Sequence, residues 1–315
     1  MSKYVFGVDI GGTTVKIGLF SVEGELLEKW EITTRTDEGG AYILSDIAAS
    51  LESKMNEKGI TKDDIKGVGM GVPGPVKEDG TVLKCVNLGW GVFNAAEELS
   101  NIIGLPVKVG NDANMAALGE YWQGGGKGYR SVIMVTLGTG VGGGIIVDGK
   151  MLAGVNGAGG ELGHMTIDLD EQDVCNCGKR GCLEQYASAT GIVRLANRAL
   201  NDSDKPSKLR EVKYISAKEI FDCAKSGDDV ALDLVEEHGK RLGYALANTA
   251  CVVDPEVFVI GGGVSRAGDI LLNAVKKYYQ QYAFHACRNA KFELAILGND
   301  AGMYGGAASI CLTEI

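Results

Sequence analysis

The sequence predicts an α/β protein built from two similar halves. Strand-like apolar runs alternate with helical patterns along the chain, which is typical of α/β folds. Two motifs also recur in the same order: GVDIGGTTVKIG at residue 7 is echoed by VTLGTGVGGGII at residue 135, and NDANMAALG (111–119) by NDAGMYGGA (299–307). Because 315 residues favour two domains over one, we expect two duplicated α/β domains with a cleft between them.

The first half begins with three predicted strands within residues 4–33, separated by turns at 11–12 and 22–24. A helix is predicted over 40–58, because apolar residues recur there at helical spacing. Short buried strands are predicted at 66–74 and 107–111, and a helix at 113–122.

The pattern restarts with three strands around glycine turns over residues 131–154. The remaining predictions are helices at roughly 188–200, 216–225, 228–251, 268–283 and 301–313, and strands at 256–263 and 293–298. No linker rich in proline or serine separates the halves, so we expect closely coupled domains.

The composition is globular and unusually rich in glycine. Charged residues make up 23% and hydrophobic residues 45% of the chain, which excludes a disordered protein. The 47 glycines are roughly twice the usual share and indicate turns where the backbone approaches something closely. A net charge of −10 argues against general affinity for nucleic acid or anionic membranes.

No apolar run is long enough for a membrane span, and the start of the chain has no signal-peptide pattern. We therefore expect a cytoplasmic protein. Its 8 cysteines should be thiols, so a cluster of cysteines suggests a metal site before a disulfide.

The segment DIGGTTVK (9–16) predicts a phosphate-binding turn. Glycines allow a tight turn with N–H groups directed at an anion, and the threonine hydroxyls can add donors. An acidic residue at the strand end would hold Mg²⁺, and the lysine could balance phosphate charge. An ordinary hairpin is the alternative, but hairpins rarely combine these residues. The predicted nucleotide-binding residues here are Asp9 (also the magnesium ligand), Gly11, Gly12, Thr13, Thr14 and Lys16.

A second glycine turn, with Gly138, Thr139 and Gly140, is predicted to bind the same nucleotide. Its GTGVGG matches the dinucleotide fingerprint formally, but a strand follows where that fingerprint requires a helix. No P-loop motif occurs. A third cluster, with Gly262 and Gly263, completes a set that suits one nucleotide held between two domains.

Asp112 follows a strand and precedes a helix, so it could be either a helix N-cap or a general base. Phosphoryl transfer asks the protein for positioning, charge neutralisation and one base. The sequence leaves both readings of Asp112 open.

A C-x-C-x₄-C pattern formed by Cys175, Cys177 and Cys182 follows His164. This spacing predicts a Cys₃His zinc site. Four protein ligands leave no open position, so we expect a structural zinc. The other cysteines are scattered and are expected to be buried thiols.

The glycine turns resemble those of the actin–hexokinase–Hsp70 superfamily, and GGELGH followed by CNCGKRGCLE resembles the signature of its ROK family (repressors, open reading frames and kinases). The resemblance spans the whole chain. It implies ATP- and Mg-dependent phosphorylation of glucose at the 6-hydroxyl, with Asp112 as the base. The implied sugar-binding residues are Gly71, Asn87, Asn111, Asp112, Glu161, His164 and Glu184.

The resemblance also implies ribonuclease H-like domains: a small domain over 1–112, joined by the C-terminal helix 301–315, and a large domain over 113–300 with the zinc site. A homodimer or homotetramer is expected. Glucose and ATP are the expected small-molecule partners, with no nucleic acid and no membrane, and polyphosphate stays open as the phosphoryl donor.

Three other functions fit parts of this pattern. A sugar-responsive repressor of the same family would carry a helix-turn-helix before the glycine turn, and Asp9 lies too near the start for one. An actin-like filament protein would have no use for the cysteine cluster. Kinases for mannose, fructose, N-acetylglucosamine or N-acetylmannosamine are separated poorly from a glucokinase by the sequence.

Overall fold

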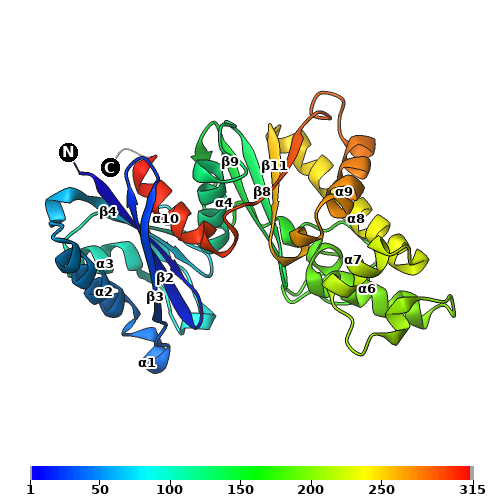
Figure 1. Ribbon diagram of the computed structural model, residues 1–315, viewed down its shortest axis with the longest axis horizontal. Helices are drawn as coiled ribbons and strands as arrows, with labels where there is room; N and C mark the ends of the chain where they lie inside the picture. Colours follow the sequence, from blue (N-terminus) through cyan, green and yellow to red (C-terminus); the bar gives the residue numbers. More distant parts are fainter. Residues whose placement is uncertain (1, 313–315) are drawn as a thin grey trace. The chain divides into compact units, whose positions relative to one another are not determined.

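A computed structural model describes residues 2–312. The predicted end of the last helix at residue 313, and residues 313–315 of the expected small domain, lie outside this range. The chain forms two compact units (Figure 1): the first comprises Met1–Gly128, Gly144–Gly160 and Ile296–Ile315, and the second Tyr129–Gly143 and Glu161–Ala295.

The first unit contains a five-stranded sheet with the order β3-β2-β1-β4-β7. Its strands are β1 (Tyr4–Ile10), β2 (Thr14–Ser21), β3 (Leu26–Thr33), β4 (Ile65–Val72) and β7 (Val107–Asn111). The first three strands pair antiparallel, whereas β1, β4 and β7 run parallel. The strands predicted for this half are thereby confirmed, and β5 (Thr81–Val82) and β6 (Phe93–Asn94) form a separate small hairpin.

Helices cover both faces of this sheet. Phe6 of β1 packs into a core with α2 (Ile43–Lys58) and α3 (Ala95–Ile103), whereas its neighbour Val5 packs with α10 (Ala301–Cys311) on the other face. The alternation follows from the two-residue period of a strand. Figure 1 shows α2 and α3 on one side of the sheet and α10 on the other.

Helix α2 begins at Ile43 rather than at the predicted residue 40. The preceding short helix α1 (Asp37–Gly40) ends with Gly39 and Gly40 at φ of 70° and 74°. This left-handed backbone suits glycine and interrupts the right-handed helix. The predicted helix is therefore confirmed, and its predicted start at residue 40 is wrong by three residues.

The second sheet repeats the order of the first as β10-β9-β8-β11-β12. Its strands are β8 (Val132–Leu137), β9 (Val141–Val147), β10 (Lys150–Met151), β11 (Val257–Gly261) and β12 (Lys291–Leu294). Here β8, β11 and β12 are parallel, as β1, β4 and β7 are in the first sheet. The matching order confirms the predicted duplication. The third strand, predicted to reach residue 154, is shorter and ends at Met151.

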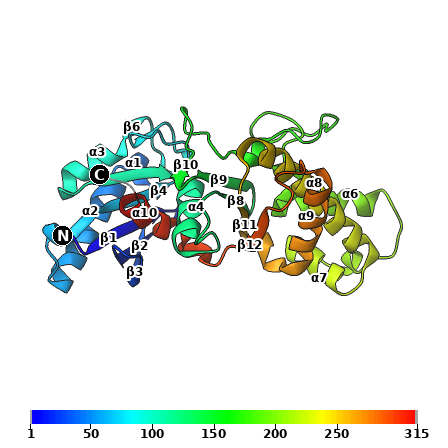
Figure 2. The same cartoon turned by 90° about the horizontal axis from the view of Figure 1, so that it is seen from above.

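Four helices of the second unit follow the predicted positions closely: α6 (Ala189–Asn201), α7 (Ala217–Lys225), α8 (Asp229–Val253) and α9 (Asp269–Tyr282). The short helix α5 (Glu184–Ala187), which the sequence did not predict, precedes them. Ser188, Ser216 and Asp228 cap the starts of α6, α7 and α8 through their side chains. Figure 2 shows α8 beside α9.

Helix α4 (Asp112–Gln123) belongs to the first unit, although the sequence analysis placed residues from 113 onward in the second domain. It packs against α10, where a Cβ on Gly305 would overlap the Met115 carbonyl. This close approach keeps the two helices together. The zinc-motif cysteines lie in the second unit.

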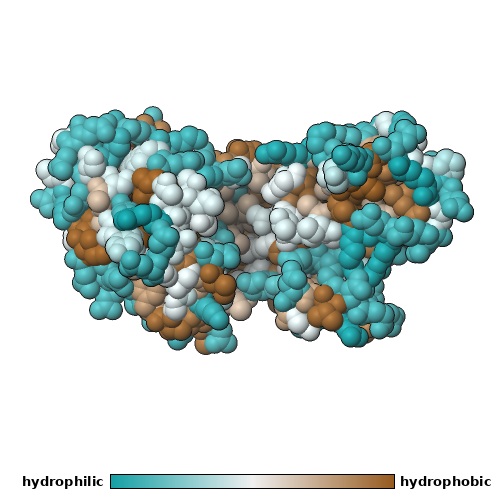
Figure 3. Space-filling view, turned by 90° about the horizontal axis from the view of Figure 1, so that it is seen from below, coloured by the Kyte–Doolittle hydropathy of each residue, from teal (hydrophilic) through white to brown (hydrophobic). Residues whose placement is uncertain are grey.

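Six short 3₁₀ turns complete the described elements; they span Lys62–Asp64, Val86–Leu88, Leu162–His164, Lys208–Glu211, Gly263–Ala267 and Gly298–Asp300. Across residues 2–312, no helix combines the length and apolar character needed to cross a membrane. Hydrophilic residues cover much of both units on the face drawn in Figure 3.

Candidate functional site

Two acidic residues of the first unit lie at the same edge of its sheet. Asp9 is near the end of β1, and Asp112 directly follows β7. Both strands run parallel to β4, so their carboxyl ends share one edge. Burial and the nearby charge of Asp112 raise the pKa of Asp9 to about 6, although Lys16 opposes the shift. Burial also raises the pKa of Asp112. The structure therefore brings the predicted magnesium ligand and the predicted base together.

Asn111, not Asp112, is the N-cap of α4. The Asn111 side chain accepts the N–H groups of Ala113 and Asn114 at 2.9 and 3.1 Å and donates to the Gly74 carbonyl at 3.1 Å. The Asp112 carboxyl accepts a local bond from the Ala113 N–H at 2.8 Å. The helix-cap alternative for Asp112 is thus wrong, because its neighbour already fills that role.

The first glycine turn is closed by the bond from the Gly11 N–H to the Thr14 carbonyl, at 2.9 Å. Gly12 and Thr13 are exposed at its tip. Lys16 donates from β2 to the Asn299 carbonyl at 2.7 Å. The turn therefore presents its tip to solvent, where a phosphate could reach it.

The second glycine turn is closed in a similar way, by the Gly138 N–H and the Gly140 carbonyl at 3.0 Å. The Thr139 carbonyl accepts the Thr190 hydroxyl at 2.7 Å. Gly262 follows β11 and packs against the Leu137 backbone at the end of β8, whereas Gly263 begins a 3₁₀ turn. Two of the predicted nucleotide-binding segments thus meet within the second unit.

Glu184, the first residue of α5, reaches this turn. Its Oε2 accepts the Val141 N–H at 3.1 Å, and its Oε1 lies 3.7 Å from the Cys175 Sγ. A Cβ on Gly140 would overlap the same carboxylate. Glu184 therefore contacts both the glycine turn and the cysteine cluster.

The four predicted zinc ligands converge. The ligand atoms of His164, Cys175, Cys177 and Cys182 all lie within 4.8 Å of one another. Cys177 and Cys182 Sγ are 3.6 Å apart, and Cys175 Sγ is 3.9 Å from His164 Nδ1. Ligand atoms about 3.8 Å apart are what a tetrahedron with metal–sulfur bonds of ~2.3 Å requires. The residues therefore fit a zinc ion.

The thiols of this cluster differ in acidity. Burial raises the pKa of Cys175 and of Cys182, and the neighbouring thiols add to the shift at Cys182. A backbone N–H of Lys179 lowers the pKa of the exposed Cys177. Metal binding requires thiolates, so loading this site would release protons.

The remaining predicted sugar-binding residues are distributed over both units. Gly71 lies on β4, where a Cβ would be 3.5 Å from Asp9 Oδ1, and the exposed Asn87 belongs to a 3₁₀ turn. Glu161 is exposed and precedes the 3₁₀ turn that ends at His164. Gly71 and Asn87 thus belong to the first unit with Asp112, whereas Glu161, His164 and Glu184 belong to the second.

The NDAG segment (299–302) contributes to the Asp9 site, which the sequence did not predict. The charge of Asp300 raises the pKa of Asp9, and Asp300 pairs with Lys29 at 2.6 Å. Gly302 packs directly against the Asp9 carboxyl, within 3 Å of where a Cβ would lie. The signal in the sequence is the repeat itself, because this segment matches the one that carries Asp112.

Comparisons with known proteins agree with this arrangement. The ROK family model matches residues 5–313. The glucokinase of Halalkalibacterium halodurans is 44% identical over 310 residues, covering 96% of this chain and 94% of that protein. The glucokinase of Streptomyces coelicolor is 37% identical, covering 96% and 95%.

The crystal structure of a ROK family glucokinase from Streptomyces griseus in complex with glucose and AMPPNP is 35% identical. It matches with a TM-score of 0.74 and covers 98% of both chains. The predicted fold class, with duplicated actin-like domains, is thereby confirmed.

Proposed function

The chain belongs to the ROK family, and we propose that it transfers the γ-phosphoryl group of ATP to the 6-hydroxyl of glucose, giving glucose 6-phosphate and ADP. The observation that carries this proposal is the state of Asp112. Asn111 caps α4, so the Asp112 carboxyl is not the cap of that helix. Asp112 lies in the same unit as Asp9, and the charge of Asp112 raises the pKa of Asp9.

Asp112 is the proposed general base. An ionised carboxylate accepts the proton of the attacking hydroxyl, and a pKa raised toward the working pH makes it a better acceptor. Sugar hydroxyls would be held by Gly71, Asn87, Asn111, Glu161, His164 and Glu184. In Asn111 the same side chain also caps α4, so a sugar would share it with the helix.

Asp9 is the proposed magnesium ligand, because a carboxylate oxygen is a preferred ligand of that ion. Bound magnesium neutralises charge on the phosphates of the nucleotide. The N–H groups of the two glycine turns and the Lys16 ammonium are proposed to hold those phosphates. The exposed residues Gly12, Thr13 and Thr139 at the tips of the turns are where a phosphate would reach them.

The cysteine cluster is proposed to hold a structural zinc through His164, Cys175, Cys177 and Cys182. A zinc-bound imidazole uses one ring nitrogen for the metal and keeps an N–H on the other. We propose that His164 donates this N–H to a sugar hydroxyl, so that the metal fixes the orientation of a substrate ligand.

The decisive experiment is a coupled ADP-release assay with glucose, mannose, fructose, N-acetylglucosamine and N-acetylmannosamine. The highest kcat/KM is expected with glucose and ATP. A clear preference for another sugar would make the chain a kinase for that sugar, and no ADP release with any of them would overturn the proposal. Replacing ATP by polyphosphate in the same assay identifies the phosphoryl donor.

A further inference from the structure

Residues 166–180, which follow His164 and precede α5, form a surface loop with little apolar anchoring. Between residues 166 and 180, only Glu171 and Cys175 are buried. Leu169 is 91% exposed, so the loop does not use its leucine to pack. A carboxylate occupies a buried position where an apolar residue is normally found.

The Glu171 carboxylate accepts hydrogen bonds on both oxygens. Oε1 accepts the Asp173 N–H at 2.9 Å and Arg198 at 3.1 Å. Oε2 accepts the Tyr186 hydroxyl at 2.7 Å, Arg194 at 2.8 Å and Arg198 at 3.3 Å. Burial by itself would raise the pKa of Glu171, but bonds from Arg198 and Arg194 hold it well below its usual range. Glu171 is therefore a buried, fully paired anion.

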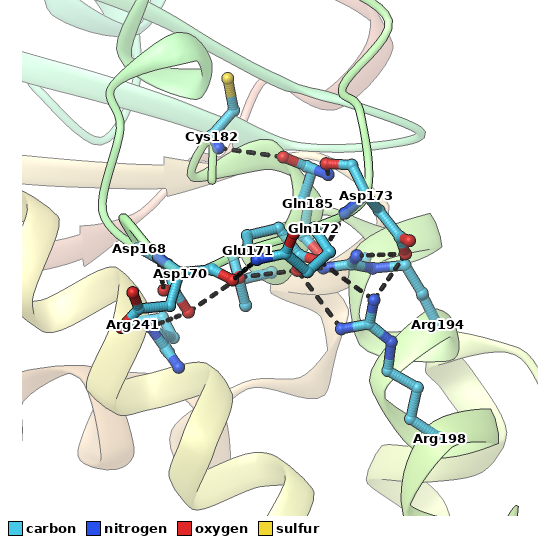
Figure 4. A network of polar contacts seen from close by, with 12 residues as sticks. Asp168, Asp170, Glu171, Gln172, Asp173, Cys182, Gln185, Arg194, Arg198 and Arg241 are labelled. Carbon is cyan, nitrogen blue, oxygen red and sulfur yellow. Dashed lines mark hydrogen bonds and ion pairs between the residues drawn. The ribbon is translucent and has the colours of Figure 1, made fainter. Parts of the chain in front are cut away.

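The Glu171 carboxylate joins the loop to α5 and α6, and Asp168 of the same loop joins it to α8 (Figure 4). Arg194 and Arg198 lie one turn apart on α6, and Tyr186 belongs to α5. Arg241 of α8 lies over the Tyr186 ring at 4.6 Å and pairs with Asp168 at 3.1 Å. Charged contacts thus replace apolar packing as the attachment of the loop.

Gln185 extends the network to the cysteines. Its side chain accepts the Cys182 N–H at 3.0 Å and donates to the Asp173 carbonyl at 3.0 Å. Arg194 donates to the Gln185 carbonyl at 2.9 Å. Asp173 lies two residues before Cys175, so the network holds the backbone near the first and last cysteines of the cluster (Figure 4).

We propose that Glu171 is a positioning residue for the candidate zinc site, because it clamps the loop in the conformation that brings the cysteines to His164. The inference rests on the proposed zinc site. A buried ion pair adds little net stability, since the cost of desolvation offsets the attraction between the charges. It does fix geometry, and metal ligands held by an outer layer of hydrogen bonds retain their metal more tightly.

The test measures zinc release from the full-length, zinc-loaded protein to a chromophoric chelator. Glu171→Gln keeps the shape of the side chain and removes its charge. It should release zinc roughly 10- to 100-fold faster than the wild type. The glucose KM should rise with it, while the ATP KM stays within about twofold.

Glu236→Gln is the matched control. Glu236 is a paired carboxylate of the same unit that accepts Lys277 at 2.6 Å and Tyr278 at 2.8 Å, and it joins α8 to α9 rather than to the loop. Its zinc release should equal that of the wild type even if its melting temperature falls. If Glu171 only stabilised the fold, Glu171→Gln would also release zinc at the rate of the wild type, whatever its melting temperature.

A second variant, Arg198→Lys, keeps the charge but loses the forked pair of hydrogen bonds. It should release zinc at an intermediate rate, and trypsin should cleave its zinc-free form after Lys179 or Arg180 faster than the zinc-free wild type. This variant decides the question if Glu171→Gln does not fold.

Zinc release from Glu171→Gln at the rate of the control would overturn the clamp and leave the zinc site intact. A wild type without bound zinc would instead overturn the zinc site, and the clamp with it.

Discussion

The carboxylate of Glu184 accepts the backbone N–H of Val141 at 3.1 Å. The two residues are 43 positions apart in the chain, and the bond ties the start of α5 to the second glycine turn. The other oxygen of Glu184 is 3.7 Å from Cys175. One proposed sugar ligand therefore contacts both a proposed nucleotide-binding turn and the proposed zinc site.

Gly140→Ala should displace Glu184, because the added methyl would overlap its carboxylate. We expect the glucose KM to rise about tenfold or more, equivalent to ~1.4 kcal/mol of lost binding. Gly138→Ala is the control in the same turn, because the nearest atom to its added methyl is 4.0 Å away. Its glucose KM should stay close to that of the wild type. Equal glucose KM values for the two variants would contradict the placement of Glu184.

Asp112→Asn should lower kcat by about 10²- to 10⁴-fold, the usual contribution of a general base. The melting temperature should change little, because the cap of α4 belongs to Asn111. Steady-state kinetics and thermal unfolding of one preparation test both points. Near-normal turnover would remove Asp112 from its proposed role.

Asn111→Ala should lower the free energy of unfolding, whereas Asp112→Asn should leave it nearly unchanged. Loss of a side-chain cap typically destabilises a protein by about 1 kcal/mol, and the Gly74 carbonyl would lose its donor as well. Urea unfolding of the two variants at the same pH gives the comparison. A free energy of unfolding that is higher for Asn111→Ala than for Asp112→Asn would contradict the assignment of the cap to Asn111.

Asp9→Asn should stabilise the protein at pH 8 and remove its activity. The folded pKa of Asp9 is raised from 3.8 to about 6, so between these values the folded state binds more protons than the unfolded state. Stability contributed by Asp9 therefore falls as pH rises through this window, and the penalty is complete above pH 6. After allowance for partial exposure, the gain from asparagine at pH 8 is on the order of 1–2 kcal/mol.

The same comparison at pH 4 supplies the control for Asp9→Asn, because there the wild-type carboxyl is largely protonated when folded and the gain should shrink. Urea unfolding without magnesium measures both free energies. Equal stability of the wild type and Asp9→Asn at pH 8 would show that burial does not penalise the Asp9 charge.

Cys182→Ser should lose zinc and raise the glucose KM at least tenfold, while the ATP KM changes far less. The expected cause is misplacement of His164 and Glu184. His164 lies in the same ligand cluster as Cys182, and Glu184 follows Cys182 by two residues in the chain. Mass spectrometry gives the zinc content, with one ion per chain expected in the wild type. A lower melting temperature with an ordinary glucose KM would instead indicate a zinc that only stabilises the fold.

The sequence predicted the elements whose patterns lie within a few neighbouring residues. Strands β1, β2 and β3, the positions of α6 and α7 and the duplication could be predicted from alternation, helical spacing, turn residues and repeats. The start of α2 could not, because the backbone of Gly39 and Gly40 is set by their surroundings; the Gly40 carbonyl accepts the Trp90 indole N–H at 3.0 Å.

The sequence by itself determined the order of the elements, the glycine turns and the spacing of the cysteines, because each depends on neighbours a few residues away. Tertiary structure decided which of two adjacent residues caps α4, that Asp300 acts on Asp9, and that the buried anchor of the cysteine loop is Glu171. These outcomes depend on charges and donors brought together from distant parts of the chain. A carboxylate in a sequence carries no mark of whether its partner will be water, a metal or an arginine, since burial and contact arise only when the chain folds.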